Sequence, residues 1–261
     1  MKRRDFITSS AALATLGAVT SQLMAADGPQ TGPREFFELR RYHLRMGPKA
    51  KLVDDYFRNA LAPALNRAGI DRVGVFNQIV GPDTPLLHLL LPCASLDTLL
   101  AAKEKILADD DYLKAASDFL EASVTDPPFV RIESSFLRAF VAMPKLETPL
   151  AGKSRIFELR TYESPTEKAA RRKIEMFNTA EIGIFHRAGL APIFFGETIF
   201  GEKLPNLTYM VAFADMNART ASWAAFGAEP EWKRLSGLPE YANVVSNITN
   251  VFLQPTSYSQ I

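Results

Sequence analysis

The hydrophobic and polar positions of the chain follow the same order of patterns twice. Apolar and polar residues alternate over about 35–43 and again over 155–163, as they do in a strand whose two faces differ. Each stretch is followed by a segment, about 48–68 and 165–188, in which apolar residues recur at three- and four-residue steps. This spacing gives a helix one apolar face. The sequence therefore predicts a strand followed by a helix in each half.

The two predicted helices have recognisable ends. The apolar face of the second helix consists of Ala170, Ile174, Phe177, Ile184 and Ala188. At its start, Ser164-Pro165-Thr166-Glu167 is a capping box with proline at the first helical position. Gly69 and Gly189 follow the two helices, where a C-cap glycine stands.

The remaining patterns complete the same element order in both halves. Further strands are predicted near 72–80, 85–92 and 129–142 in the first half and near 192–199, 206–213 and 247–254 in the second, with another helix over about 95–122 and 215–236. The order βαββαβ, found twice, is that of the ferredoxin-like α+β fold.

A sequence repeat supports this duplication. Phe37-Glu38-Leu39-Arg40-Arg41-Tyr42 returns 120 positions later as Phe157-Glu158-Leu159-Arg160-Thr161-Tyr162, and Arg67-Ala68-Gly69-Ile70, Gly81 and Pro85 return at the same offset. We therefore predict two tandem repeats, at 35–142 and 154–255. The stretch 143–153 contains Pro and Gly and is interpreted as the linker.

The inner strands indicate how the two repeats pack. Leu86–Leu91 and Tyr209–Phe213 are almost entirely apolar on both faces, as strands buried on both sides are. A ferredoxin-like repeat covers only one face of its sheet with helices, so the other face needs a partner. We predict that the two sheets pack against each other as one intramolecular eight-stranded α+β barrel with room for side chains or one small ligand. A homo-oligomer is compatible with this arrangement but is not required by it.

Composition excludes several classes of function. The 30 Lys and Arg residues and 29 Asp and Glu residues leave a formal net charge of +1. Nucleic acids and anionic membranes are bound through a concentrated positive field, so neither is predicted as a partner. Cys93, the single cysteine, cannot form an internal disulfide or a multi-cysteine metal site. No HExxH motif, Walker loop or dinucleotide fingerprint is present, so no metal and no cofactor is predicted.

The N-terminus resembles a bacterial twin-arginine signal peptide. Arg3 and Arg4 stand before Phe6 and Ile7, and a weakly apolar stretch follows from Ala11 to Val19. This stretch is too short to span a bilayer, which takes about 20 residues, so no membrane anchor is predicted. We expect cleavage near Ala26, a signal peptide at 1–26 and a periplasmic mature protein.

The chain resembles the NIPSNAP family, whose repeats open with a Glu-x-Arg-x-Tyr strand. Both repeats carry this motif, and the second also carries the family's helix pattern, with Arg219, Trp223 and Phe226 followed by Glu229-Pro230-Glu231-Trp232. The first repeat departs from that pattern, having Asp110-Asp111-Tyr112 and no arginine aligned with Arg219. If the pattern carries function, the first repeat is only structural. The resemblance implies a dimeric α+β barrel and loosely defined transport or scaffolding roles, and superfamily relatives include cofactor-independent monooxygenases, haem-degrading enzymes and dye peroxidases.

The opening strands supply the candidate ligand-binding residues. Strand alternation puts Glu38, Arg40 and Tyr42 on one face in the first repeat and Glu158, Arg160 and Tyr162 on one face in the second. If the intervening phenylalanines and leucines pack under the helices, these polar rows face the barrel lumen. There, arginine would bind a carboxylate or enolate while tyrosine or glutamate shuttles a proton. The favoured alternative is a pair of buried ion-pair networks that fix strand register.

Other polar residues are expected to be structural. His43, His88 and His186 have no histidine at the aligned position of the other repeat. Glu181 lies in the apolar seam of its helix and is expected to extend its carboxylate to solvent. We interpret the aromatic residues Trp223, Phe226 and Trp232 as core between helix and sheet. The sequence identifies no catalytic residue, so catalytic residues are left unknown.

Two functional hypotheses follow. The first is non-catalytic binding of a small, partly apolar molecule or a protein partner through the barrel. The alternative is a cofactor-independent enzyme, similar to a monooxygenase or an isomerase, with its site inside the barrel. Large side chains filling the lumen would argue against a ligand there.

Overall fold

The computed structural model describes residues 32–45, 47, 49–150 and 155–261. The predicted signal peptide, with Arg3 and Arg4, lies outside the described residues, and so do the last residues of the predicted linker. Within the described residues, no helix is sufficiently long and apolar to cross a membrane.

The structure contains the predicted order of elements in both repeats. The first repeat comprises β1 (Phe36–Leu44), α1 (Ala50–Asp55), a π-helical turn (Tyr56–Leu61), α2 (Ala62–Arg67), β2 (Gly74–Val80), β3 (Leu86–Cys93), α3 (Leu96–Leu107), α4 (Asp110–Leu120) and β4 (Phe129–Ala139). The second comprises β5 (Ile156–Glu163), α5 (Glu167–Met176), a π-helical turn (Phe177–Glu181), α6 (Ile182–Arg187), β6 (Ala191–Phe200), β7 (Asn206–Phe213), α7 (Met216–Ala228), α8 (Pro230–Ser236), a 3₁₀ turn (Pro239–Tyr241) and β8 (Asn247–Pro255).

Local chemistry explains where the helices begin and end. The side chain of Thr166 accepts a hydrogen bond from the Ala169 amide at 3.1 Å, so Thr166 is the N-cap of α5, and the prediction that Ser164 caps this helix was wrong. The predicted helix over 95–122 is two helices, because Asp109 accepts from the Tyr112 amide and starts α4. The predicted helix over 215–236 is also two helices, and Pro230 stands at the first helical position of the second one, α8. Gly69 and Gly189 adopt positive φ angles of 96° and 76°, as predicted for C-cap glycines.

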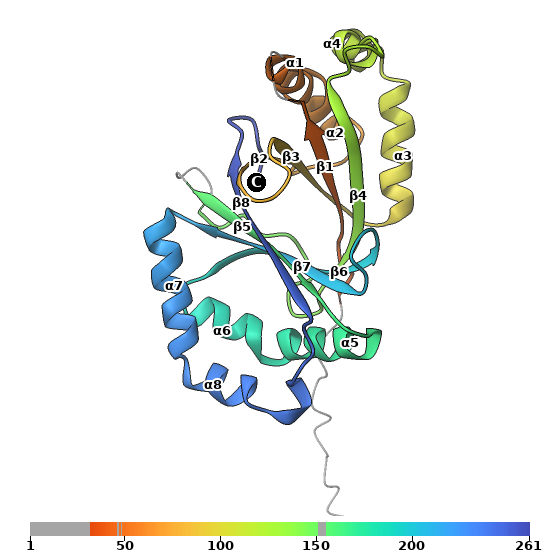
Figure 1. Ribbon diagram of the computed structural model, residues 1–261. Coiled ribbons are helices and arrows are strands. Elements are labelled where there is room, and N and C mark those ends of the chain that lie inside the picture. The colour runs from red at the N-terminus through yellow and green to blue at the C-terminus, as the bar shows by residue number, and fades with distance from the viewer. Residues whose placement is uncertain (1–31, 46, 48, 151–154) are drawn as a thin grey trace, which may run out of the picture. The chain divides into compact units, whose positions relative to one another are not determined.

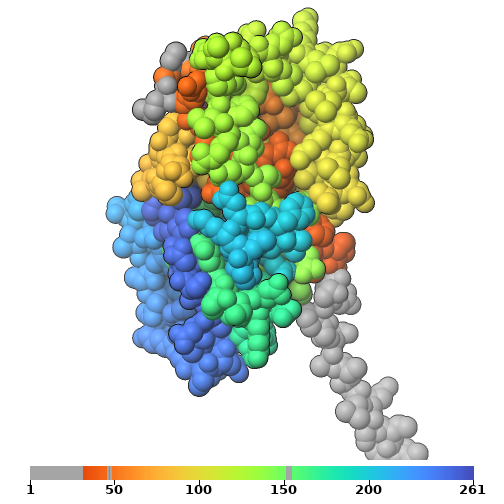
Figure 2. All heavy atoms as spheres, turned by 45° about the vertical axis from the view of Figure 1, so that its right-hand side comes forward, coloured from red at the N-terminus to blue at the C-terminus, as the bar shows by residue number. Residues whose placement is uncertain are grey.

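The eight strands form one closed barrel, which confirms the predicted fold. Their order is β1-β3-β2-β8-β5-β7-β6-β4, and every neighbouring pair is antiparallel. Each repeat contributes four adjacent strands, and the repeats join where β2 pairs with β8 and β4 pairs with β6. Figure 1 shows α1 to α4 beside the strands of the first repeat and α5 to α8 beside those of the second. In Figure 2 the cyan β6 segment lies against the first repeat, at the seam where it pairs with β4.

Apolar side chains fill the centre of the lumen. The buried cluster there consists of Phe37, Leu39, Phe76, Leu90, Leu137, Ala139, Leu146, Phe157, Leu159, Ile193, Phe194, Met210, Ala212, Val251, Leu253 and Ile261. Phe37 packs on Phe194 with ring centroids 5.0 Å apart, and Phe76 packs on Phe157 at 4.9 Å. The lumen is therefore a packed core, and its centre has no room for a ligand.

The predicted orientation of the opening strands was wrong. The phenylalanines and leucines of β1 and β5 face the lumen, and the rows Glu38, Arg40, Tyr42 and Glu158, Arg160, Tyr162 face the helices. The physical reason is that burying a carboxylate requires donors. The helices supply such donors, from Lys103 and Arg219, whereas the centre of the lumen is lined by apolar side chains.

The packed lumen generates a prediction about stability. Leu253→Ala removes a fully buried lumen side chain and is expected to lower the free energy of unfolding by about 2–5 kcal/mol. Leu100→Ala is the matched control, because Leu100 is 48% exposed on α3, and its loss should stay below about 1 kcal/mol. Urea unfolding followed by circular dichroism measures both values. Equal losses would show that the lumen is not tightly packed.

Candidate functional site

A buried carboxylate lies between sheet and helices in the second repeat. Glu158 on β5 has no exposed side-chain surface. Its Oε1 accepts from Arg160 Nη1 at 2.6 Å and Arg219 Nη2 at 3.0 Å, and its Oε2 accepts from Arg219 Nε at 2.7 Å and Trp223 Nε1 at 2.8 Å. Burial alone would raise the pKa of Glu158, but these donors outweigh it and lower the pKa. The carboxylate is therefore ionised and fully hydrogen-bonded.

The same network extends to two buried tyrosines. Arg160 Nε and Nη2 donate to the Tyr162 hydroxyl at 3.3 and 3.2 Å, and the Tyr162 and Tyr209 hydroxyls lie 2.9 Å apart. Burial raises the pKa of both phenols, so they remain neutral. The row Glu158, Arg160 and Tyr162 thus lies in a closed network that links β5 to α7 and β7.

A second buried ion pair lies on the helix side of this network. Lys173 Nζ lies 2.6 Å from Glu181 Oε2, and Glu181 is 2% exposed. The expectation that Glu181 reaches solvent was wrong, because Lys173, two turns earlier on the same face, provides an internal partner. Burial nevertheless raises the pKa of Glu181. The aligned residues of the first repeat, Val53 and Leu61, are apolar.

The first repeat holds its carboxylate differently. Glu38 on β1 accepts from Arg40 Nη2 at 2.7 Å, Lys103 Nζ at 3.2 Å and Ser134 Oγ at 2.9 Å. Burial opposes the ionisation of Glu38, but the Arg40 donor and the charges of Arg40 and Lys103 outweigh it, so the pKa of Glu38 is lowered. Two cations therefore share a single ionised carboxylate.

An open cleft adjoins this group. Its volume is about 420 Å³, and it is lined by Glu38, Arg40, Tyr56, Leu61, Leu65, Lys103, Ile106, Leu107, Tyr112, Ile132 and Ser134. We call it the first-repeat cleft. One wall carries two hydroxyls 3.1 Å apart, those of Tyr56 and Tyr112. Leu107 and Ile132 are 67% and 43% exposed, so the cleft combines polar groups with accessible apolar surface.

Aromatic side chains occupy the corresponding place in the second repeat. Trp223 aligns with Lys103, and its indole packs edge-on against Phe185 at 5.5 Å and Phe226 at 5.6 Å. Trp232, which aligns with Tyr112, continues the cluster with its ring 4.5 Å from Phe226. The prediction that these aromatic residues are core between helix and sheet is confirmed. The difference at one aligned position, lysine against tryptophan, accompanies an open cleft in one repeat and a packed interface in the other.

The predicted site residues thus divide into two groups. Glu38 and Arg40 line the first-repeat cleft, whereas Tyr42 is buried in the core beneath it. The second-repeat row lies in the closed network described above. Lys103, Ser134, Tyr56 and Tyr112 were missed, because they come from elements distant in sequence from the opening strand. Lys103 could have been found from the sequence, because it aligns with Trp223 of the second repeat and differs from it in charge.

The chain belongs to the NIPSNAP family. The NIPSNAP sequence model matches residues 37–141 and again 157–260, so both repeats are family domains. No curated protein matches the chain significantly in sequence. Among the residues that the structure describes, no three His, Cys, Asp or Glu side chains form a group that could hold a metal ion.

Solved structures share the architecture. A proposed monooxygenase from Lactobacillus acidophilus NCFM superposes with a TM-score of 0.56 at 9% identity, covering 85% of this chain and 94% of its own. A second proposed monooxygenase, from Fusobacterium nucleatum, gives 0.56 at 6% identity, covering 85% and 92%. An uncharacterised NIPSNAP-like domain protein from Burkholderia xenovorans is 24% identical over 40% of this chain and 88% of its own, with a TM-score of 0.36. At these identities the first two similarities establish the fold alone.

The Glu158 network generates a prediction about pH. The pKa of Glu158 is lower in the folded protein than its ordinary value of 4.5. Ionisation of Glu158 therefore stabilises the fold above pH 4.5. This contribution to the free energy of unfolding is lost as the pH falls through the folded-state pKa. Near neutral pH, Glu158→Gln is expected to lower the free energy of unfolding by about 3–5 kcal/mol, because Arg160 and Arg219 lose their counter-charge.

The difference between wild type and this variant should shrink below about pH 4. Urea unfolding between neutral and acidic pH measures it. Glu175→Gln is the control, because Glu175 is 53% exposed on α5 and should change stability by less than about 0.5 kcal/mol. A loss for Glu158→Gln that stays constant with pH would contradict the assignment of an ionised carboxylate.

Proposed function

We propose that this NIPSNAP-family protein binds one small amphipathic anion in the first-repeat cleft and does not convert it chemically. The cleft has apolar walls and a polar end at which two cations, Arg40 and Lys103, share the single carboxylate of Glu38.

The charge balance supports an anionic head group. Glu38 neutralises one of the two cations, so one positive charge remains uncompensated within this group. The Lys103 side chain is 42% exposed, and its bond to Glu38 is the longest of the three at 3.2 Å. A carboxylate entering the cleft can therefore accept a charge-assisted hydrogen bond from Lys103 while Arg40 keeps its bond to Glu38.

The walls support an apolar body on the ligand. Leu61, Leu65 and Ile106 are buried around the cleft, and Leu107 and Ile132 expose apolar surface at its rim. Covering that surface is favourable by roughly 25 cal/mol per Å². A volume of about 420 Å³ lies within the range of small-molecule sites, about 300–1,000 Å³. A chain or ring of modest size fits this space.

The protonation states favour binding over acid–base catalysis. The pKa of Glu38 is lowered, so it is an ionised acceptor near neutral pH. Burial raises the pKa of Tyr56, so its phenol stays protonated. General acid–base catalysis works best with a group whose pKa is near the operating pH, and neither residue meets this condition. The alternative of a cofactor-independent enzyme therefore receives less support from this cleft.

Octanoate is a suitable probe of the proposal. We expect isothermal titration to detect its binding to the wild type, and Lys103→Met to weaken it about tenfold or more, because the charged donor is lost. Lys105→Met is the matched control, since Lys105 lies exposed on the same helix and does not line the cleft. Octanol should bind more weakly than octanoate to the wild type.

Lys103→Trp gives a sharper test, because it copies the aligned residue of the second repeat. The indole should fill the cleft and donate to Glu38, as Trp223 donates to Glu158, so the fold is kept while octanoate binding is abolished. A folded Lys103→Trp protein that binds octanoate with wild-type affinity would show that the ligand lies elsewhere. A wild type that binds no octanoate would contradict the proposed class of ligand.

Export is part of the proposed function. The support is the sequence of residues 1–26, where Arg3 and Arg4 precede an apolar stretch of signal-peptide length. We expect replacement of both arginines by lysine to retain the protein in the cytoplasm of a host with a twin-arginine pathway. Immunoblots of cytoplasmic and periplasmic fractions measure the effect. Unchanged periplasmic levels in the variant would contradict this route.

A further inference from the structure

A second cavity lies at one end of the barrel lumen. Its volume is about 190 Å³, and it shares no lining residue with the first-repeat cleft. Its apolar floor consists of Leu39, Leu137, Leu159 and Val251, which belong to the packed centre of the lumen. Both repeats line its polar walls. We call it the mouth cavity.

The two repeats line the mouth cavity with different chemistry. The first contributes Arg41, Gln78, His88 and Glu133 on its strands, and the second contributes Thr161, Thr198, Thr208 and Thr249 on its strands. Asp83 and Ser135 of the first repeat and Glu202, Lys203 and Asn206 of the second complete the polar lining. Three of the first-repeat residues align with three of the threonines at the 120-residue offset: Arg41 with Thr161, Gln78 with Thr198 and His88 with Thr208. Glu133 and Thr249 also occupy equivalent places, because each lies opposite the aligned residue on the neighbouring strand, Glu133 opposite Arg41 and Thr249 opposite Thr161. Along the opening strands, the lumen centre keeps the same residues in both repeats, Phe37 with Phe157 and Leu39 with Leu159, whereas the mouth has Arg41 against Thr161.

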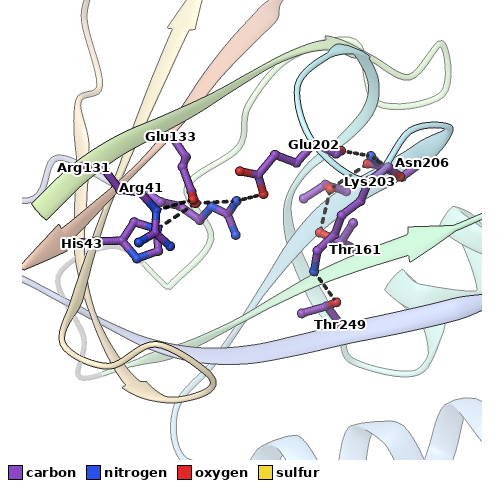
Figure 3. A network of polar contacts seen from close by, with 10 residues as sticks. Arg41, His43, Arg131, Glu133, Thr161, Glu202, Lys203, Asn206 and Thr249 are labelled. Carbon is purple, nitrogen blue, oxygen red and sulfur yellow. Dashed lines mark hydrogen bonds and ion pairs between the residues drawn. The ribbon is translucent and has the colours of Figure 1, made fainter.

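The charged groups of the mouth neutralise one another. Figure 3 shows Arg41 between Glu133 and Glu202, and its Nη2 lies 2.8 Å from Glu133 Oε2. Arg131 Nε and His43 Nε2 each lie 2.7 Å from Glu133. Burial opposes the ionisation of Glu133, but the donors Arg131 and His43 and the charge of Arg41 outweigh it and lower the pKa to about 2. The cations Arg41, Arg131 and Lys203 balance the carboxylates of Asp83, Glu133 and Glu202, so a ligand needs no net charge to compensate the cavity lining.

The side of the cavity that carries Thr161, Thr198, Thr208 and Thr249, which we call the threonine wall, has a defined direction of hydrogen bonding. Asn206 Nδ2 donates to backbone carbonyls of the preceding loop, so its Oδ1 is the acceptor for Thr198 at 2.6 Å and Thr208 at 3.3 Å. Because the Thr208 proton is used, Thr161 donates to Thr208 across 2.9 Å. The Thr161 oxygen keeps its lone pairs as acceptors.

Donors are available at the other end of this wall. Lys203 Nζ donates to Thr249 Oγ1 at 2.8 Å, as Figure 3 shows. The Thr249 oxygen accepts this bond, so its own proton can be donated to a ligand. A wall with both free lone pairs and a donor proton matches hydroxyl groups, which are donors and acceptors at once.

His88 adds a buried acceptor. Gln78 Nε2 donates to the Pro82 carbonyl at 2.6 Å, so its Oε1 faces His88 Nε2 at 3.0 Å, and the imidazole proton is on Nε2. Burial lowers the pKa of His88 to about 3, so the ring is neutral. Nδ1 is then an acceptor, and it is buried without a hydrogen-bond partner among the described residues. His88 lines the cavity, and a ligand hydroxyl that reached Nδ1 would satisfy it.

Size and shape narrow the class of ligand. The volume is slightly larger than the roughly 150 Å³ of an apolar cavity that holds benzene, so a single ring fits and a tetrapyrrole does not. The leucine and valine floor favours an apolar ring face, and the walls favour hydroxyl groups on its edge. We propose that the mouth cavity is a second ligand site, which takes one small, uncharged, hydroxylated ring compound between the two repeats.

Resorcinol is the probe, with benzene and benzoate as the apolar and charged comparisons. In NMR titrations of the whole protein, resorcinol should bind about tenfold or more tightly than either comparison. The double variant Thr161→Val, Thr208→Val keeps the shape of the wall and should weaken resorcinol binding about tenfold or more. Thr220→Val is the control, because Thr220 lies exposed on α7. Lys103→Trp should leave resorcinol binding unchanged, which separates this site from the first-repeat cleft.

A direct readout uses the wild-type protein. The ¹⁵N resonance of His88 Nδ1, identified by its loss in His88→Leu, should move toward that of a hydrogen-bonded acceptor when resorcinol is added. An unmoved resonance, unchanged affinity in the double threonine variant, or loss of resorcinol binding in Lys103→Trp would each overturn the proposal. So would equal affinity for benzene, because the polar walls would then contribute nothing.

Discussion

Each repeat is organised around one carboxylate buried between its sheet and its helices. Glu38 and Glu158 are 3% and 0% exposed, and a buried carboxylate is tolerated only where donors surround it. Besides Arg40, Ser134 and Arg160 on strands, donors come from the helices, Lys103 on α3 and Arg219 on α7, so the polar face of the opening strand lies under the helices. Strand alternation then turns Phe37 and its counterpart into the lumen. The apolar centre of the barrel is therefore a consequence of placing each carboxylate beside its helix donors.

The two repeats differ in how fully donors surround the buried carboxylate. In the second repeat, Arg219 and Trp223 saturate the carboxylate and fill the space beside it. In the first, Lys103 makes one longer bond and leaves an open cleft. A saturated network adds rigidity, whereas the Lys103 side chain stays 42% exposed beside its longer bond. Duplication thus allows one repeat to stabilise the barrel while the other keeps accessible polar groups.

The sequence predicted the element order, the tandem duplication and the closed barrel, because periodicity, helix caps and the 120-residue offset are local or self-comparing signals. It did not determine which face of the opening strand meets the lumen. Alternation shows that Glu38 and Phe37 lie on opposite faces, but the choice between the faces depends on Lys103 and Arg219, which are more than 60 positions from the carboxylates they bind. Glu181 was misplaced for a related reason, since its position depends on an ion pair with Lys173 that the apolar spacing of the helix does not reveal. Partners in space, rather than patterns along the chain, decide the position of a buried charge.

The polar cavities lie at the periphery of the barrel because its centre is packed. A lumen packed with Phe37, Phe76, Phe157 and Phe194 cannot admit a ligand without losing several kcal/mol of packing, which is about the cost of emptying one large core side chain. At the mouth, by contrast, the strands carry Arg41 and Thr161 in place of the aromatic rings, and these side chains line a cavity outside the packed centre. Divergence between repeats is therefore least costly at the barrel end, where Arg41 aligns with Thr161, and at the helix–sheet clefts, where Lys103 aligns with Trp223.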